Sequence, residues 1–260
     1  MSGRFEGRVA LVTGAAGQSE GRQGMGKAVA VELALGGAAL ALNDLDAERL
    51  EESADDLRKL GAHVTTHPGS VSDDGFVEEM VRAATSAHGR IDLLHNHVGG
   101  GPPGARWGDL VDVGLDDFRA FLELNLVSQV AVLKAVLPGM IERRYGRIVC
   151  TSSFSAVLGQ EGGSAYAAAK AGLHGLVYSV AKEVGRYGVN LNTVVIGNPP
   201  APGRTEARQE FLNRLSHLGR PGRFEEFGRA IAFLLSDDAG YISGAAVPVD
   251  GGILVPRLLE

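Results

Sequence analysis

The stretch VALVTGAAGQSEGRQGMGKAVAVELAL, residues 9–35, decides the fold of this chain. It begins with a short apolar run at 9–12, passes through a glycine-rich segment and ends in an apolar stretch with helical spacing at 26–35. An apolar strand, a glycine-rich turn and a helix form the unit from which parallel α/β sheets are built. The glycines let the backbone approach a phosphate, and free N–H groups at the helix start favour its negative charge.

The same alternation of apolar runs and amphipathic stretches continues along the chain. Further strands are expected at 38–42, 91–94, 148–150 and 191–196, and further helices at 47–60, 76–88, 118–143, 165–187 and 225–235. Asp46 and the acidic segment 72–74 provide helix entry signals. The sequence therefore predicts a single doubly wound α/β domain of Rossmann type over residues 1–260. Its parallel sheet of about seven strands is expected to carry helices on both faces.

Composition excludes several classes of protein. Of the 260 residues, 45% are hydrophobic and 22% are charged, which excludes a mainly disordered chain. A net charge of −6 argues against a nucleic-acid-binding surface. There is no uninterrupted apolar run of about 18 to 20 residues, so no membrane span is expected. Residues 1–7 lack a signal-peptide core, and the one cysteine, Cys150, cannot form an internal disulfide. We expect a cytoplasmic protein.

Three loops that follow predicted strands, 14–24, 99–104 and 197–204, are expected to cluster at the carboxyl edge of the sheet, where such folds bind ligands. Asp44 follows the second strand, 18 residues after Gly26. A carboxylate there can accept hydrogen bonds from the ribose hydroxyls of an adenosine. The glycine cluster and Asp44 together favour dinucleotide binding.

With these features in place, the sequence resembles the classical short-chain dehydrogenase/reductases almost from end to end. The family's motifs have counterparts, in order and at the family's spacing, in Thr13, Gly14, Gly24 and Gly26, the segment 96–99, Asn125, Ser153, Tyr166 with Lys170, and the segment 249–252. The serine stands thirteen residues before the tyrosine, which selects Ser153 rather than Ser152. The resemblance implies an oxidoreductase that uses a nicotinamide dinucleotide.

The resemblance also implies the role of each catalytic residue. Tyr166 and Lys170 are four residues apart and project from one helix face. A tyrosine titrates near 10, and the Lys170 ammonium together with the positive nicotinamide ring is expected to lower that pKa. Tyr166 is then the general acid for ketone reduction and the base for alcohol oxidation. Ser153 holds the substrate oxygen, Lys170 also binds the nicotinamide ribose, and Asn125 seats a water in a proton relay.

The implied cofactor contacts are spread over the whole chain. They are Gly14, Gly24, Met25, Gly26, Asp44, Ser70, Val71, Asn96, Tyr166, Lys170 and Gly197. Asp44 suits two free ribose hydroxyls and would repel a 2′-phosphate, so NAD is preferred over NADP. Arg22 and Lys27 are the cations that could oppose this preference; Lys27 is expected to face solvent.

The sequence departs from the family pattern at four places. Residues 18–23 lengthen the phosphate loop, and Ser70 stands where an aspartate is common near the adenine. His97 replaces the second asparagine of the family's Asn-Asn-Ala-Gly segment; with His95 it could suggest a metal, but no third ligand is evident and no metal site is expected. Gly197 is followed by an asparagine and two prolines, 198–200, although a backbone N–H in this stretch normally holds the nicotinamide carboxamide.

The substrate is the least defined part of the prediction. A neutral, apolar or cyclic secondary alcohol or ketone is preferred, with candidate walls in Trp107, Phe154, Val157, Leu158 and Phe211. Arg204, Arg208 and Arg214 could instead serve a phosphorylated or CoA-bearing substrate. Two alternatives stay open: a 3-oxoacyl-thioester reductase and a non-catalytic dinucleotide-binding protein.

Two further expectations concern the assembly and the loop after the sixth strand. The long apolar helices 118–143 and 165–187 are expected to pair across two-fold axes into a homo-oligomer, a tetramer. The segment 197–218 is expected to act as a lid over the nicotinamide site.

Overall fold

The computed structural model describes residues 3–17, 24–201 and 203–256. Its centre is a sheet of seven strands, all parallel, in the order β3-β2-β1-β4-β5-β6-β7. The strands are β1 Val9–Thr13, β2 Ala39–Asp44, β3 Val64–Pro68, β4 Leu93–Asn96, β5 Gly146–Ser153, β6 Val189–Ile196 and β7 Ala246–Val249. The predicted doubly wound parallel sheet is confirmed. The strand order reverses between β1 and β4, which is where such sheets form a crevice for ligands.

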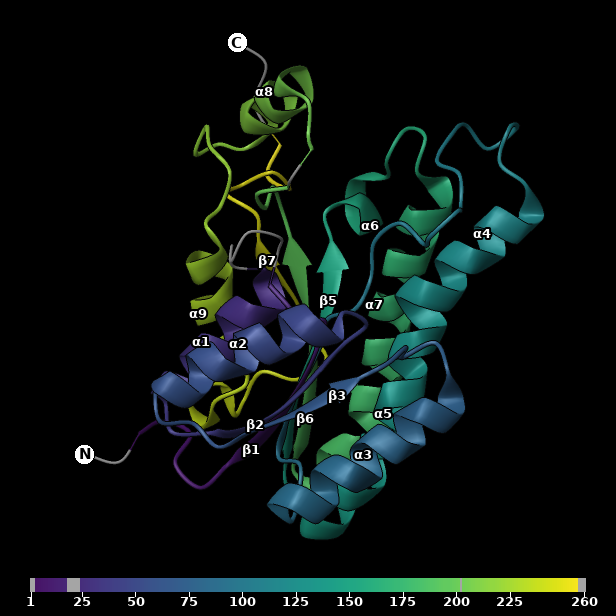
Figure 1. Cartoon of the computed structure of the whole chain (residues 1–260). Helices are drawn as coiled ribbons and strands as arrows, with labels where there is room; N and C mark the ends of the chain where they lie inside the picture. Colours follow the sequence, from purple (N-terminus) through teal and green to yellow (C-terminus); the bar gives the residue numbers. More distant parts are fainter. Residues whose placement is uncertain (1–2, 18–23, 202, 257–260) are drawn as a thin grey trace.

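Helices cover both faces of the sheet (Figure 1). One face carries α1 Met25–Leu35, α2 Ala47–Lys59 and α9 Phe224–Leu234, and the other carries α3 Asp74–His88, α5 Ser128–Arg143 and α7 Ser164–Val184. The remaining helical elements are α4 Leu115–Leu122, η1 Glu123–Val127, α6 Ser155–Leu158, η2 Gly185–Tyr187, α8 Glu206–Leu215 and η3 Asp237–Ala239. Figure 1 shows α6 and α8 beyond the carboxyl ends of β5 and β6.

Successive residues of a strand pack into two separate hydrophobic cores, one on each face of the sheet. In β1, Ala10 and Val12 pack with α1 and α9, while Leu11 packs in the core beneath α3 and α5. β2 repeats the pattern, with Leu40 on the first side and Ala41 on the second. Because both faces of each central strand are buried, these strands read in the sequence as continuous apolar runs.

The helix that the sequence predicts over 118–143 is interrupted in the structure. α4 ends at Leu122, a π-helical turn, η1, follows, and α5 then continues to Arg143. The stretch Leu115–Arg143 is long and apolar enough by length and composition to cross a membrane. Here Val132, Leu133 and Val136 pack in the core beside the sheet, which accounts for part of that apolar composition. A π-turn widens the helix at one residue, and such turns are frequent at functional sites.

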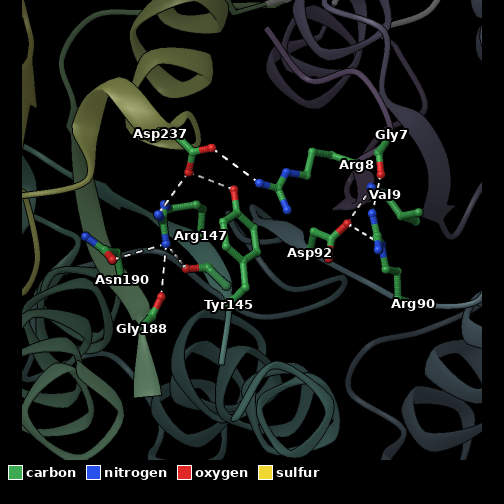
Figure 2. A network of polar contacts seen from close by, with 11 residues as sticks. Gly7, Arg8, Val9, Arg90, Asp92, Tyr145, Arg147, Gly188, Asn190 and Asp237 are labelled. Carbon is green, nitrogen blue, oxygen red and sulfur yellow. Dashed lines mark hydrogen bonds and ion pairs between the residues drawn. The ribbon is translucent and has the colours of Figure 1, made fainter. Parts of the chain in front are cut away.

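The amino ends of the strands are tied together by a polar network far from the loops that follow the strands (Figure 2). Asp237 accepts hydrogen bonds from Arg8 at 3.3 Å, Tyr145 at 3.0 Å and Arg147 at 2.9 Å. The two guanidiniums lie 3.7 and 4.5 Å from the centre of the Tyr145 ring. Burial raises the pKa of Tyr145 to about 12, so its hydroxyl stays a donor to Asp237 at neutral pH. The network fixes η3 against β5.

Candidate active site

A cavity of about 570 Å³ opens at the carboxyl ends of β5 and β6. Three of the four predicted catalytic residues line it: Ser153, Tyr166 and Lys170. Ser153 is the last residue of β5, and Tyr166 and Lys170 follow in successive turns at the start of α7. The fold thus places the serine at the end of β5 next to the helix face that carries the tyrosine and the lysine.

The Ser153 hydroxyl is held in place by its neighbours. Its Oγ donates to Ser155 Oγ at 3.2 Å and accepts from the Ser155 backbone N–H at 3.2 Å. Ser155 Oγ in turn donates to Gln160 at 2.9 Å. Ser152 points its hydroxyl elsewhere, because it donates to the Lys170 carbonyl at 3.0 Å. Both serines line the cavity, and Ser153 is the one whose hydroxyl forms a hydrogen bond with Tyr166.

Lys170 is buried beside this serine, and Tyr166 is partly buried there. Burial raises the pKa of Tyr166, and a hydrogen bond with Ser153 acts in the opposite direction. From the sequence we expect the Lys170 ammonium to lower the Tyr166 pKa; in the chain alone, burial outweighs any such effect. Lys170 Nζ lies 5.8 Å from the centre of the Tyr166 ring and donates to the Thr151 carbonyl at 2.9 Å. Burial lowers the pKa of Lys170 to about 8.

Asn125, the fourth predicted catalytic residue, lies in η1 and does not line the cavity. Its Oδ1 accepts from the Gly100 N–H at 2.7 Å, and its Nδ2 donates to the Gly100 carbonyl at 2.9 Å and to Phe121 at 3.0 Å. The side chain thus fixes the loop after β4 against the π-turn. The water relay expected at Asn125 stays a prediction.

A second cavity, of about 190 Å³, lies at the carboxyl ends of β1 and β2. Gly14, Asp44, Ser70 and Val71, all predicted to bind the cofactor, line it. The Asp44 carboxylate accepts from the Ala16 N–H at 3.0 Å and from the Leu45 N–H at 2.7 Å. These bonds hold the carboxylate at the cavity wall.

The two cavities meet at the loop after β4, because His97 and Gly99 line both. A Cβ atom on Gly99 would lie 2.6 Å from Lys170 Nζ and 2.7 Å from Asn125 Oδ1. Met25 and Gly197 line the larger cavity, so two more predicted cofactor residues reach this region. The two cavities therefore adjoin at Gly99, where a side chain would collide with Lys170 and Asn125.

Close contacts between backbone segments explain why the phosphate loop contains glycines. A Cβ on Gly26 would lie 2.1 Å from the Gly14 carbonyl oxygen. Gly14 itself has φ +68°, a conformation that other residues rarely adopt. Gly24 is the N-cap of α1, and no side chain caps that helix. The free N–H groups at its start fit a pyrophosphate. The residues present therefore fit a dinucleotide.

The chain matches known proteins along almost its whole length. Residues 17–254 match the family model described as enoyl-(acyl carrier protein) reductase. A 3-oxoacyl-[acyl-carrier-protein] reductase, FabG, of Thermotoga maritima is 34% identical over 256 residues, which cover 97% of this chain and 100% of that protein. The chain belongs to the short-chain dehydrogenase/reductase family. It is thus an oxidoreductase of a family that binds a nicotinamide dinucleotide.

Solved structures of this family share the fold. The crystal structure of a levodione reductase superposes with a TM-score of 0.89 at 34% identity, covering 95% of this chain and 98% of the other. A 7α-hydroxysteroid dehydrogenase complexed with NADH and 7-oxo-glycochenodeoxycholic acid gives a TM-score of 0.88 at 26% identity, with 96% and 95% covered.

Some residues that the short-chain dehydrogenase/reductase motifs select do not face the groove. Asn96 is buried and lines neither cavity; its Nδ2 donates to the Gln129 carbonyl at 2.9 Å and so ties β4 to α5. The Gly197 N–H already donates to the Val249 carbonyl at 3.1 Å. It is therefore committed to the sheet, although Gly197 itself lines the larger cavity.

Two predictions about cations in the phosphate region have different outcomes. Lys27 does not face solvent: it is buried, and its Nζ lies 2.7 Å from Asp56 Oδ2. The expectation was wrong because Asp56 on α2 gives the ammonium a partner close to α1. The insertion 18–23, with Arg22, lies outside the described residues.

The histidine that departs from the family pattern stacks on its neighbour. The His95 and His97 rings lie 5.1 Å apart and 20° from parallel, as expected for alternate residues on one strand face. Both contact Thr151 Oγ1, at 3.0 Å and 3.2 Å. Burial and the Lys170 charge lower the pKa of His97 to about 4. Within the residues that the structure describes, no cluster of three metal-ligating side chains is found.

Thr151 is a site residue that sequence reasoning missed, and Thr13 was matched to the phosphate-loop motif without being given a role. The Thr151 carbonyl holds Lys170, and its hydroxyl lies between the two histidines. Thr13 Oγ1 accepts from the His97 N–H at 2.9 Å and so positions the loop after β4. Each threonine directly follows a predicted strand, 9–12 or 148–150, where a β-branched residue continues the strand pattern and carries no separate functional signal.

Proposed function

We propose that this protein is an NAD(H)-dependent secondary alcohol dehydrogenase or ketone reductase. The observation that carries the proposal is the placement of Ser153, Tyr166 and Lys170 in one cavity that meets a second, ribose-sized cavity at Gly99. Asn125 is the fourth member of the proposed catalytic set, and its side chain holds the Gly100 backbone.

The proposed chemistry needs one proton donor and one hydrogen-bond donor at the carbonyl oxygen. The Ser153 hydroxyl holds that oxygen, and Tyr166 Oη delivers the proton in reduction or takes it in oxidation. Lys170, 5.8 Å from the Tyr166 ring, stabilises the phenolate that remains after proton transfer. The bound nicotinamide supplies the hydride in reduction and accepts it in oxidation.

NAD is the proposed cofactor because of the fixed carboxylate at Asp44. A 2′-phosphate in the smaller cavity would meet this like charge, which the Ala16 and Leu45 N–H groups hold in place. Lys27, the candidate cation on α1, already pairs with Asp56 at 2.7 Å.

We also propose a cytoplasmic homotetramer. Val127 and Tyr178, on the two helical stretches expected to pair, expose 43% and 46% of their surface. A second copy of the chain could cover such apolar surface across a two-fold axis. Light scattering at micromolar concentration tests this, and a mass of one chain, 27.1 kDa, would contradict it.

The experiment that tests the proposed function is a panel of secondary alcohols and ketones with NAD(H) and NADP(H). Turnover is followed by the absorbance of the reduced nicotinamide. Activity on some members, with NAD(H) favoured, is expected. Binding of NADH without turnover of any alcohol or ketone would instead support the non-catalytic alternative.

A second candidate is a 3-oxoacyl-thioester reductase. It is favoured by the 34% identity to the Thermotoga maritima FabG and by the description of the matching family model. Reduction of an acetoacetyl thioester at rates above those of simple ketones would favour this candidate.

A further inference from the structure

Two arginines line the cavity that holds Tyr166 and Ser153. Arg204 stands in the loop between β6 and α8, and Arg208 lies in the first turn of α8. Figure 1 shows α8 beyond the carboxyl end of β6, across from α6, which follows Ser153 in the chain. Both arginines therefore reach the cavity from the segment between β6 and the first turn of α8, whereas the proton donor Tyr166 lies on α7.

Arg204 is held in place by neutral groups. Its Nη1 donates to Asn198 Oδ1 at 2.8 Å, to the Pro199 carbonyl at 2.9 Å and to Gln209 Oε1 at 2.9 Å. Asn213 extends the network, because Asn198 Nδ2 and Gln209 Nε2 both donate to its Oδ1. The network fixes one edge of the guanidinium and leaves Nε and Nη2 without an acceptor among the described residues.

Neither arginine has a charge partner among the residues that the structure describes. In the part of the chain that the structure describes, no carboxylate lies within ion-pair distance of Arg204 or Arg208, whereas Arg58, Arg147 and Arg220 each pair with one. Burial and the Arg208 charge both lower the pKa of Arg204. Arg208 is oriented over the Phe211 ring, 5.1 Å from its centre.

The charge of the cavity wall is one-sided. Lys170, Arg204 and Arg208 line it, and no Asp or Glu among the described residues does. A guanidinium with free N–H groups in a partly enclosed site binds carboxylates through charge-assisted hydrogen bonds. The preference for a neutral substrate stays a prediction, and these cations give the cavity a second candidate, a substrate that carries a negative charge.

We propose that the substrate carries a carboxylate that Arg204 and Arg208 bind while its alcohol or ketone faces Tyr166. The substrate class is then a hydroxy acid or oxo acid whose carboxylate lies some distance from the reacting carbon. This proposal rests on the proposed function, since it assigns one end of the same cavity to the reacting group. The competing use of the arginines is to bind the cofactor pyrophosphate, because Met25 of the phosphate region lines the same cavity.

The test uses two ketones of equal size that differ only in charge, 4-oxocyclohexanecarboxylate and 4-oxocyclohexanecarboxamide. The full-length wild type and the variants Arg204→Gln and Arg208→Gln are assayed with NADH, and the Kd for NADH is measured separately. Arg214→Gln is the matched control, because Arg214 is exposed in the last turn of α8 and does not line the cavity. Arg208→Gln keeps the experiment interpretable if loss of Arg204 disturbs the loop network.

The wild type is expected to prefer the carboxylate by about tenfold in kcat/KM, and each cavity variant should lose most of that preference with its Kd for NADH unchanged. Arg214→Gln should behave as the wild type. Equal kcat/KM for the two ketones in the wild type, or equal losses on both in the variants, would overturn the proposal. A weaker Kd for NADH with the preference retained would assign the arginines to the cofactor and would also overturn it.

The proposed function and the carboxylate site fail in different ways. If neither ketone turns over, binding of both compounds to the NADH complex is measured by calorimetry. Tighter binding of the carboxylate that Arg208→Gln abolishes supports the carboxylate site even though the proposed reaction is absent. Equal binding of the two compounds overturns the carboxylate site.

Discussion

Lys170 Nζ donates to the Thr151 carbonyl at 2.9 Å, in a position where only 2% of the lysine is exposed. One backbone carbonyl replaces little of the hydration that an ammonium loses on burial. The pKa of Lys170 accordingly falls from 10.5 to about 8. The fold therefore keeps a positive charge beside Tyr166 at a cost in its own stability.

Lys170→Met is expected to raise the free energy of unfolding at pH 7 by up to about 3 kcal/mol, because each pKa unit corresponds to about 1.4 kcal/mol. The same change should abolish turnover and weaken NADH binding. Chemical denaturation and NADH fluorescence measure the two effects.

The pKa of Lys170 is lower in the folded chain than in the unfolded chain, so the wild type regains stability as the pH rises from about 8 to about 10.5. A stability gap between the two proteins that stays constant over this range would contradict the assignment.

His97 is expected to make the fold sensitive to acid. The pKa of His97 is about 4 in the folded chain, whereas an ordinary histidine side chain has a pKa of 6.5. As the pH falls, the unfolded chain therefore binds the proton before the folded chain does. Its contribution is complete above about pH 6.5 and is lost as the pH falls toward about 4. Between about pH 7 and about pH 5, the wild type should lose about 2 kcal/mol more unfolding free energy than His97→Asn does. His95 is present in both proteins, and because the His97 charge lowers the His95 pKa, the difference between the two proteins includes this coupling. Parallel losses in urea denaturation would show that His97 is not responsible.

Asp44→Ala is expected to shift the cofactor preference toward NADPH. The wild type should favour NAD(H) by at least about tenfold in kcat/KM, because the held carboxylate repels a 2′-phosphate. Steady-state kinetics with both cofactors measure this. The conservative change Asp44→Asn should give an intermediate result, since it keeps the size of the side chain and removes only the charge. Comparable use of NADPH by the wild type would contradict the role of Asp44.

The segment 203–218 is expected to become more ordered when ligand binds. Leu212 is its buried apolar anchor, at 4% exposed, and most of its remaining attachments are polar, including the Asn198–Arg204 bond. Segments held by few apolar contacts open locally at low cost. Hydrogen exchange should slow in α8 on addition of NADH and a ketone. Exchange that is equally slow with and without ligand would exclude a lid.

The sheet could be predicted because burial on both faces leaves a direct signal. Leu11 and Val12 face opposite cores, so their strand is apolar throughout. The helix α8 could not be predicted from a buried apolar pattern. Among its ten residues Leu212 is the buried one, and the sequence of the helix is otherwise polar. The π-turn at Asn125 was also missed, because apolar periodicity continues across it and the widened turn depends on the Gly100 backbone that Asn125 binds.

The prediction of site residues was limited in the same way, because part of the site depends on tertiary contacts. Ser153, Tyr166 and Lys170 could be placed because strand end and helix spacing determine which way they face. Asn96 and Gly197 were also selected by comparison with the family, yet Asn96 Nδ2 donates to the Gln129 carbonyl and the Gly197 N–H donates to the Val249 carbonyl. Such competition between backbone partners depends on tertiary packing, which a motif does not record.

Tyr166→Phe tests the central claim most directly, because it removes one oxygen atom from the cavity and leaves the ring in contact with Trp107. On the best substrate of the panel, turnover should fall by several orders of magnitude, in line with the loss of a positioned proton donor. The Kd for NADH, measured on the same samples, should be nearly unchanged, since the tyrosine hydroxyl faces Ser153 and the substrate. A variant that keeps more than about a tenth of the wild-type turnover would contradict the account.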